Sequence, residues 1–217
     1  MAYKDVMKTT TEPTPLRPFP AHAVYRALFN AWGPQHWWPG RTRLEIIVGA
    51  ILTQNTAWSN VEKAIRVLRR EKALTVEALH QAPEERLAEW IRPAGYFRVK
   101  AHRLKAFIHM LRDQHNGSLN RLFAQPTPAL REQLLAVNGI GPETADSILL
   151  YAGGHGVFVV DAYTRRFLTR HGWAHEHQTY DEIARLFTPS IPDDTQLFNE
   201  FHALIVRLGK ETCRARQ

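Results

Sequence analysis

The 217-residue chain contains a single cysteine, Cys213, so it cannot form an internal disulfide framework, and a reducing compartment is expected. It has no run of 18 or more apolar residues and no signal-peptide pattern after Met1, so neither a membrane span nor a membrane partner is expected. Acidic residues are fewer than basic ones, 21 against 28, and the resulting charge of +7 favours an anionic partner. We therefore expect a cytoplasmic protein of ordinary globular composition.

Strand patterns are scarce as well. The apolar run Val157–Val160 is the one strand-like segment, and no second alternating segment exists to pair with it, so an all-α fold is predicted. The first 20 residues contain four prolines and four threonines and are expected to form a flexible arm. Apolar periodicity predicts helices over residues 21–31, 43–53, 57–70, 76–80, 83–90, 97–115, 129–135, 142–152, 162–171, 180–187 and 197–208.

A glycine hairpin organises the chain around Leu134–Asp161. Gly139 and Gly141 permit a tight turn, and Pro142 suits the first position of the helix that follows. Free N–H groups of such a turn and helix point outward together, which makes a site for a phosphate oxygen. By itself, GIG also fits an ordinary corner between two helices. The longer pattern GIGPETADSILLYA, followed by VVDAYTRR, is more specific.

This segment resembles the helix-hairpin-helix glycosylases of the endonuclease III superfamily. LTQNTAWSNVEKA (52–64), RPAGYFRVKAHRL (92–104) and FHALIVRLGKETC (201–213) follow the order and spacing of that family. The resemblance implies an all-α, two-lobed helical bundle with a central DNA-binding cleft. Residues 43–152 would form one lobe, with the helix-hairpin-helix at 134–152, and residues 21–42 and 153–217 would form the other.

Asp161 matches the catalytic aspartate of that superfamily by its distance from the hairpin. A carboxylate beside a sugar C1′ can stabilise the positive charge that builds as a base departs, and it can orient the attacking water. The alternative is that Asp161 only caps the helix that follows it. Members with lyase activity carry a lysine 18 residues before the aspartate, and here that position is Glu143, which cannot form a Schiff base. The absent lysine favours a monofunctional enzyme, although a lysine elsewhere could act.

Aromatic residues suggest the kind of base. The Trp37-Trp38-Pro39 loop and Trp58 resemble the 3-methyladenine glycosylase branch of the superfamily. Electron-rich indole faces attract a positively charged alkylated purine, and a flipped-out base needs a flat pocket. The alternative is that these tryptophans only pack the core. Lys210 is placed near the pocket by resemblance and is expected to be partly desolvated, unless it is a solvated lysine in the last turn of its helix.

Several residues are expected to contact DNA. Gln54 matches the family residue that enters the duplex where the base has left, and it would share a helix face with Trp58 if the helix has begun by residue 54; otherwise it caps the helix. The long helix 97–115 offers a basic face through Arg98, Lys100, Arg103 and Lys105, which contacts phosphate or is simply solvated. The hairpin residues expected at the DNA are Asn138, Gly139, Ile140, Gly141, Glu143 and Thr144.

No cofactor is expected. Cys213 stands where the first of four cluster-binding cysteines occurs in many superfamily members, but four residues follow it, so this chain alone cannot bind an iron–sulfur cluster. Either this branch has lost the cluster or the chain is truncated before it. A monovalent cation at the hairpin stays possible. His171, His175 and His177 match no zinc spacing, so no metal site is expected.

The sequence thus predicts a monomeric, nucleoid-associated DNA N-glycosylase of base excision repair that acts on double-stranded DNA containing an alkylated base, with Asp161 catalytic. One rival is an endonuclease III-like glycosylase/AP lyase acting on oxidised pyrimidines or mismatches. A rival of another class is a non-catalytic DNA-binding module that uses the hairpin alone.

Overall fold

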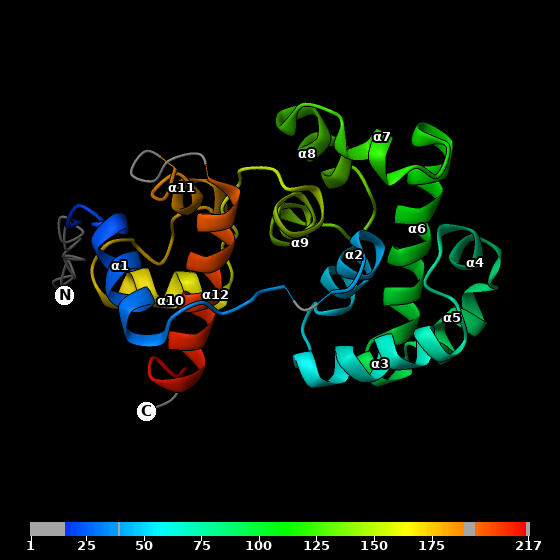
Figure 1. The fold of residues 1–217 in the computed structure, drawn as a ribbon, viewed down its shortest axis with the longest axis horizontal. Coiled ribbons are helices and arrows are strands. Elements are labelled where there is room, and N and C mark those ends of the chain that lie inside the picture. The colour runs from blue at the N-terminus through cyan, green and yellow to red at the C-terminus, as the bar shows by residue number, and fades with distance from the viewer. Residues whose placement is uncertain (1–15, 39, 189–193, 216–217) are drawn as a thin grey trace, which may run out of the picture.

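The computed structural model describes residues 16–38, 40–188 and 194–215, and every regular element within these ranges is a helix. The all-α prediction is confirmed for this part of the chain, where Val157–Val160 runs as an extended segment without a strand partner. The helices gather into two groups with separate hydrophobic cores, as Figure 1 shows. None of the described helices is both long enough and apolar enough to span a lipid bilayer.

The first group is built around α2 (Arg43–Leu52), in which eight of ten residues are buried. Thr42 begins this helix, because its hydroxyl oxygen accepts a hydrogen bond from the Glu45 amide at 3.1 Å. The other helices of this group contribute their apolar side chains to the same hydrophobic core. They are α3 (Trp58–Arg70), α4 (Val76–Gln81), α5 (Glu84–Trp90), η1 (Arg92–Ala94), α6 (Phe97–His115), α7 (Leu119–Phe123), α8 (Thr127–Leu135), α9 (Pro142–Ser147) and η2 (Ile148–Gly153).

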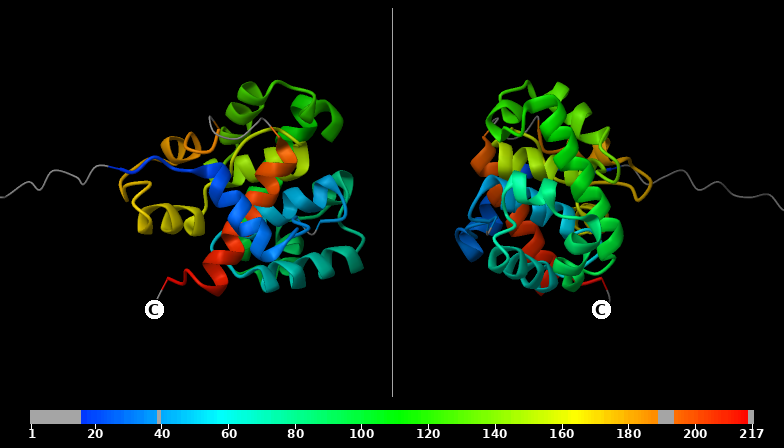
Figure 2. Two further views of the ribbon diagram at one scale, coloured as in Figure 1. Left: turned by 60° about the vertical axis from the view of Figure 1, so that its left-hand side comes forward. Right: turned by 90° about the vertical axis from the view of Figure 1, so that its right-hand side faces the viewer.

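The second group combines the two ends of the described chain. Helix α1 (Ala21–Trp32) lies beside α12 (Thr195–Glu211) in each view of the molecule, and α10 (Ala162–Arg170) and α11 (Tyr180–Ala184) pack on the same core (Figures 1 and 2). Aromatic rings fill this core; the Phe158 and Phe187 rings, for example, stack with their centroids 3.6 Å apart. Two segments that are distant in sequence therefore form one lobe, which we call the terminal lobe; the α2 group is called the hairpin lobe.

The end of the predicted N-terminal arm is attached to the terminal lobe. The Arg17 amide donates a hydrogen bond to the Gly172 carbonyl at 3.0 Å, and the Phe19 ring lies 4.9 Å from the Phe187 ring. The prediction of a flexible arm is therefore wrong for residues 16–20, because Phe19 packs its ring against apolar side chains of the terminal lobe. Residues 1–15 lie outside the described part of the chain.

Helix α6 has the predicted bounds, but its basic residues do not form one face. Lys100 is only 1% exposed, and its ammonium donates hydrogen bonds to the carbonyls of Leu52 and Ala94 at 2.9 and 2.8 Å. Lys105 likewise donates to the carbonyls of Leu79 and His80. Of the four basic residues predicted to meet phosphate or water, Arg98 alone is exposed. The prediction of a basic face is therefore wrong.

The hairpin joins α8 to α9 as expected. Gly139 has a φ of 81°, and a Cβ added there would lie 2.3 Å from the Arg103 Cγ, so the turn needs glycine for its backbone and for close packing. The predicted helix over 142–152 forms, but it changes from the α-helix α9 to the π-helix η2 at Ile148. This wider turn sets the direction in which the side chains after Ser147 point, which apolar periodicity does not reveal.

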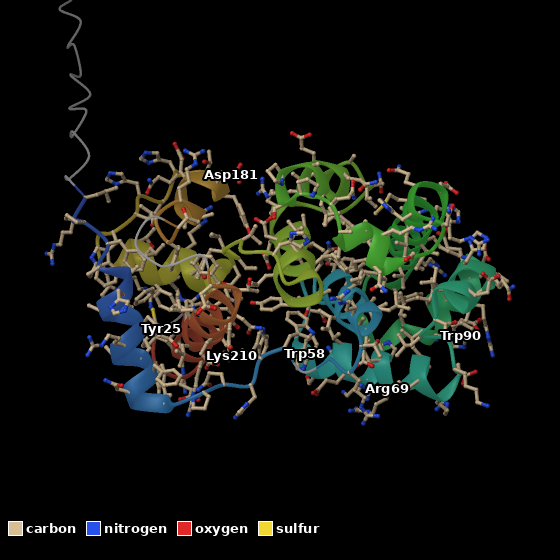
Figure 3. All side chains as sticks on the ribbon, turned by 45° about the horizontal axis from the view of Figure 1, so that its top comes forward. Tyr25, Trp58, Arg69, Trp90, Asp181 and Lys210 are labelled. Atoms are coloured by element: carbon tan, nitrogen blue, oxygen red, sulfur yellow. The ribbon has the colours of Figure 1, made fainter. Side chains whose placement is uncertain are left out.

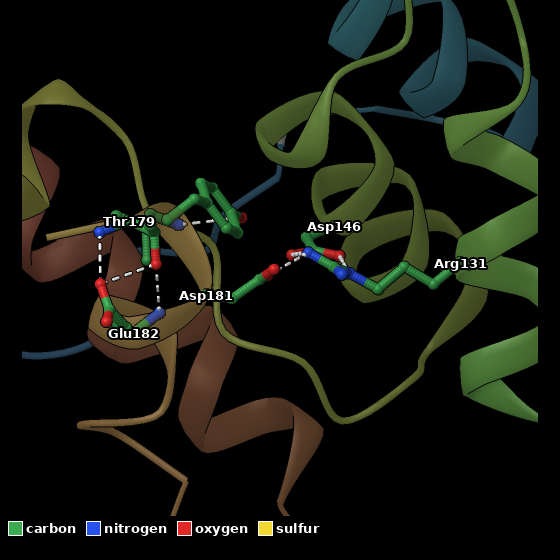
Figure 4. A network of polar contacts seen from close by, with 7 residues as sticks. Arg131, Asp146, Thr179, Asp181 and Glu182 are labelled. Carbon is green, nitrogen blue, oxygen red and sulfur yellow. Dashed lines mark hydrogen bonds and ion pairs between the residues drawn. The ribbon is translucent and has the colours of Figure 1, made fainter.

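A polar network links the two lobes beside the hairpin (Figure 4). Arg131 on α8 holds the buried Asp146 of α9 with two hydrogen bonds, of 2.7 and 3.2 Å, and contacts Asp181 of α11 at 2.8 Å. Tyr180, next to Asp181, accepts a hydrogen bond from the Val160 amide at 3.2 Å. The hairpin helix is thus connected to the segment that leads to Asp161.

Candidate active site

A cavity of about 550 Å³ lies where the lobes meet, and both lobes line it. In Figure 3, Trp58 on the hairpin lobe and Lys210 on the terminal lobe lie close together at the centre of the molecule. Six of the thirteen predicted site residues line this one cavity: Trp37, Trp38, Trp58, Glu143, Asp161 and Lys210. Thr53, Asn55, Ser147, Tyr163 and His202 line it as well.

Asp161 both caps a helix and faces the cavity. Its Oδ1 accepts a hydrogen bond from the Thr164 amide at 2.7 Å, so it begins α10, and its side chain keeps 14% exposure where it lines the cavity. The two roles predicted as alternatives are therefore compatible. Burial raises the pKa of this carboxyl, but the His202 ring and the hydrogen bonds from Thr164 outweigh burial and hold the pKa below its ordinary value. Asp161 is an anion at neutral pH.

His202 on α12 lies directly beside this carboxylate. Its Nε2 is 3.5 Å from Asp161 Oδ2, and its Nδ1 is hydrogen-bonded to the Tyr151 hydroxyl of η2. Neither residue was singled out by the sequence analysis. Both belong to segments quoted for the family resemblance, but no local pattern shows that positions 151, 161 and 202 meet.

Three indole rings form one wall of the cavity. The Trp38 and Trp58 rings are edge to face with centroids 5.0 Å apart, and Trp37 lies 5.4 Å from Trp38 and 6.2 Å from Trp58. The Tyr151 ring extends the cluster, 5.0 Å from Trp38. Pro39, predicted for the same pocket, lies outside the described residues. The three tryptophans are half-buried, and all three line the cavity at the junction of the lobes.

Lys210 reaches the same wall from the last turn of α12. Its ammonium lies 5.7 Å from the centre of the Trp37 ring, at cation–π distance. The residue is exposed, so the expectation of a partly desolvated lysine is wrong. It is, however, the one lysine among the described residues that line the cavity.

Glu143 occupies the first turn of α9 and places a second carboxyl group at the cavity. Among the described residues its carboxylate has no hydrogen-bond donor. Desolvation of the Glu143 carboxyl by the surrounding protein raises its pKa, and the negative charge of Asp161 raises it further. Where lyase members of the superfamily have an amine, this chain therefore presents a carboxyl group.

The loop between α2 and α3 differs from the prediction. Gln54 points at the hairpin: its Nε2 donates to the Gly139 carbonyl at 3.0 Å and to the Thr144 hydroxyl at 2.9 Å, and its Oε1 accepts from Arg103. Helix α3 begins at Trp58, so Gln54 and Trp58 do not share a helix face. The next residue, Asn55, is exposed with a φ of 53° and lines the cavity, whereas Gln54 does not.

The hairpin residues divide into exposed and buried ones. Asn138 and Gly141 are exposed, whereas Ile140 and Thr144 are buried, so the last two support the hairpin through their side chains. Within the described residues, the N–H groups of Gly139, Gly141 and Glu143 have no hydrogen-bond acceptor. These amides at the start of a helix suit a phosphate oxygen, as predicted.

The described residues offer little for a cofactor. They contain no group of three or more His, Cys, Asp or Glu side chains arranged to hold a metal ion. Cys213 is unpaired, and its carbonyl accepts a hydrogen bond from Arg166 at 2.8 Å. One hairpin carbonyl, that of Gly139, already accepts from Gln54. A cation at the hairpin stays a prediction.

A hairpin with free amides, a cavity between two helical lobes and an ionised aspartate at the start of a helix together define a helix-hairpin-helix DNA glycosylase. The comparison with family models agrees: residues 48–193 match the HhH-GPD superfamily of base excision DNA repair proteins, and the chain belongs to this family. It is a DNA glycosylase of base excision repair, and its substrate is DNA.

Two curated relatives are similar over most of the chain. The protein MJ1434 of Methanocaldococcus jannaschii, provisionally named a DNA repair glycosylase, is 44% identical over 194 residues, which cover 89% of this chain and 88% of the relative. Endonuclease III of Thermotoga maritima is 27% identical and covers 78% of this chain and 74% of the relative. The chain therefore spans most of the length of these relatives.

Solved structures share the fold. The Helicobacter pylori 3-methyladenine DNA glycosylase MagIII, in complex with 1,N6-ethenoadenine, superimposes with a TM-score of 0.78 and 29% identity, covering 88% of this chain and 97% of that one. A trapped endonuclease III–DNA covalent intermediate has a TM-score of 0.76 at 22% identity, covering 90% of this chain and 87% of that one. The second likeness concerns the fold alone.

Proposed function

We propose that this glycosylase is monofunctional and removes positively charged alkylated purines of the 3-methyladenine type from double-stranded DNA. The observation that carries the proposal is the shared cavity, in which the ionised Asp161 lies with the three indole rings. A base with a delocalised positive charge is attracted to the electron-rich faces of Trp37, Trp38 and Trp58.

The chemistry follows from the same charge. A cationic purine leaves its sugar as a neutral molecule, so no group has to protonate it first. The positive charge that develops on the sugar is stabilised by the Asp161 carboxylate, which can also orient the attacking water. A flipped nucleotide needs a site open to the DNA side, and Asn55 and Glu143 line the cavity from the hairpin lobe.

The comparisons support this choice of substrate. The H. pylori relative is named a 3-methyladenine DNA glycosylase and is 29% identical over nearly its whole length. Glu143 supports the monofunctional assignment, because a carboxyl group cannot form the Schiff base that lyase chemistry requires.

The test uses a panel of duplexes that each carry one lesion. Single-turnover base release is expected from 3-methyladenine duplexes, and Asp161→Asn is expected to lose it by roughly 100-fold or more while binding DNA as well as the parent protein. Asparagine still caps a helix, so α10 is preserved. Asp194→Asn is the matched control, because Asp194 caps α12 through the amides of Gln196 and Leu197 and does not line the cavity. Full turnover by Asp161→Asn would reject the proposal.

The lyase alternative has one specific residue in its favour, the Lys210 amine at the cavity. Borohydride reduction during the reaction traps any Schiff base as a covalent protein–DNA adduct. We expect no adduct with the parent protein. An adduct that disappears in Lys210→Met would instead establish a bifunctional enzyme in which Lys210 replaces the missing lysine.

A further inference from the structure

We propose that His202, held by Tyr151, is the positioning residue that keeps the Asp161 carboxylate ionised and aimed into the cavity. The inference rests on the proposed catalytic role of Asp161 and adds two residues to the active site. Neither acts on the base or the sugar; both act through Asp161.

The two oxygens of the Asp161 carboxylate face two different helices. Oδ1 is fixed by the Thr164 amide of α10 at 2.7 Å, and Oδ2 faces the Nε2 of His202 on α12 at 3.5 Å. His202 is only 5% exposed, and its buried Nε2 has no hydrogen-bond partner among the described residues. A buried ring nitrogen is costly to leave unpaired. Among the described residues, the Asp161 carboxylate is the one acceptor recorded within ion-pair distance of Nε2, so it is the group that this nitrogen faces.

Tyr151 decides which ring nitrogen of His202 carries the proton. Its hydroxyl is hydrogen-bonded to Nδ1, and burial, followed by the charge of Asp161, raises the pKa of this phenol well above its ordinary value. The hydroxyl therefore keeps its proton and is able to donate it to Nδ1. When the hydroxyl donates to Nδ1, a neutral imidazole carries its own hydrogen on Nε2, the nitrogen that lies 3.5 Å from Asp161 Oδ2.

The other charged groups around the carboxylate do not replace His202. Glu143 on α9 repels the Asp161 anion, and Lys210 on α12 is exposed, with its ammonium over the Trp37 ring. Burial also works against ionisation of Asp161, and the Thr164 hydrogen bonds are the one other stabilising contribution. Loss of His202 therefore leaves burial opposed by Thr164 alone, and the carboxyl group takes up a proton at higher pH.

Tyr151 also joins this arrangement to the base pocket. Its ring lies 5.0 Å from that of Trp38 and 6.0 Å from that of His202. The residue that orients His202 is thus packed against the indole wall predicted to hold the base. The π-helix η2 makes this possible, because Tyr151 is presented from its wide turn.

The experiment measures Asp161 directly. The carboxyl carbon of Asp161 is followed by NMR as a function of pH in the DNA-free protein, and its signal is assigned by its absence in Asp161→Asn. In His202→Leu the pKa of Asp161 is expected to rise by about one unit or more. His202→Gln retains an amide donor on the same side chain and is expected to restore most of the shift. His155→Leu is the control, because His155 is hydrogen-bonded to Thr127 and does not line the cavity.

Kinetics supply the second readout. Single-turnover base release by His202→Leu is expected to fall toward acid pH in a range where the parent protein is flat, while the dissociation constant for DNA changes less than twofold. Tyr151→Phe should shift the acid limb of the pH–rate profile in the same direction by a smaller amount, and it keeps the test available if His202→Leu does not fold.

An unchanged Asp161 pKa in folded His202→Leu, or an equal rise in His155→Leu, would overturn the inference. If Asp161→Asn is inactive while His202→Leu shows no shift, only this inference fails and the proposed function stands.

Discussion

Asp161 shows how one residue meets a structural and a chemical demand together. One oxygen begins α10 and the other faces His202, so the helix and the carboxylate hold each other in place. Gly139 likewise has more than one role in the hairpin. Its φ of 81° makes the turn, its missing side chain leaves room for Arg103, and its carbonyl holds Gln54. At this scale each residue meets a structural and a functional demand through different atoms.

The hairpin gives a prediction at the residue scale. Gly139→Ala is expected to lower the free energy of unfolding by about 1–3 kcal/mol and to weaken DNA binding, because alanine is strained at this φ and its Cβ would displace Arg103. Gly141→Ala is the matched control: its φ is −92° and a Cβ there meets nothing within 4 Å. Urea unfolding and fluorescence anisotropy with a labelled duplex measure the two effects. Equal behaviour of the two variants would contradict this account of the turn.

Helix α6 shows how an element is organised by one buried charge. Lys100 falls on the stripe formed with Leu104, Phe107 and Leu111, so its stem packs in the core of the hairpin lobe. Its ammonium reaches the carbonyls that end α2 and η1, where helix dipoles favour a positive charge. These ends lead directly into the Gln54 loop and into α6. The lysine therefore fixes the loop that lines the cavity.

The buried lysine predicts a pH dependence of stability. Burial, helped by the charge of Arg103, lowers the pKa of Lys100 from 10.5 to about 8. Between pH 8 and 10 the unfolded chain therefore binds more protons at this site, so the folded state gains stability as the pH rises, by at most about 3 kcal/mol. Urea unfolding of the parent protein should show this gain relative to Lys100→Met. The exposed Lys63→Met is the control, and a difference between parent and Lys100→Met that does not change with pH would refute the argument.

The whole molecule depends on how two lobes with separate cores are joined. The cavity exists only at their junction, so the orientation of the lobes sets the distance between the indole wall and Asp161. The network of Arg131, Asp146 and Asp181 spans this junction beside the hairpin (Figure 4). Positive charge exceeds negative by seven over the whole chain, which favours the approach of DNA.

The network gives a prediction at the scale of the lobes. Arg131→Met leaves the Asp146 carboxylate, 3% exposed, without its partner, and we expect a loss of about 3–5 kcal/mol in the free energy of unfolding. Asp181→Asn removes the exposed partner of the same arginine and should cost at most about 1 kcal/mol. The double variant Arg131→Met with Asp146→Leu should recover much of the loss, because no buried charge remains unpaired. Urea unfolding measures the stability of all three variants. Similar losses for Arg131→Met and Asp181→Asn would contradict the view that the buried Arg131–Asp146 pair contributes more than the exposed Arg131–Asp181 pair.

Sequence patterns by themselves predicted the helical class, most helix bounds, the glycine hairpin and the position of Asp161. These features are local: periodicity, capping residues and turn glycines act within a few residues, and the family motifs have fixed spacings. The short helix α7, begun by Ser118, was missed although its cap is also local.

Tertiary structure alone decided the rest. Gln54 turned to the hairpin and left Asn55 at the cavity, Lys100 entered the core, and His202 and Tyr151 came to Asp161 from 41 and 10 residues away along the chain. The side of a loop or helix that a side chain occupies depends on which distant surface offers it a partner or buries its apolar stem. That choice is made when the lobes pack, and no short stretch of sequence contains it.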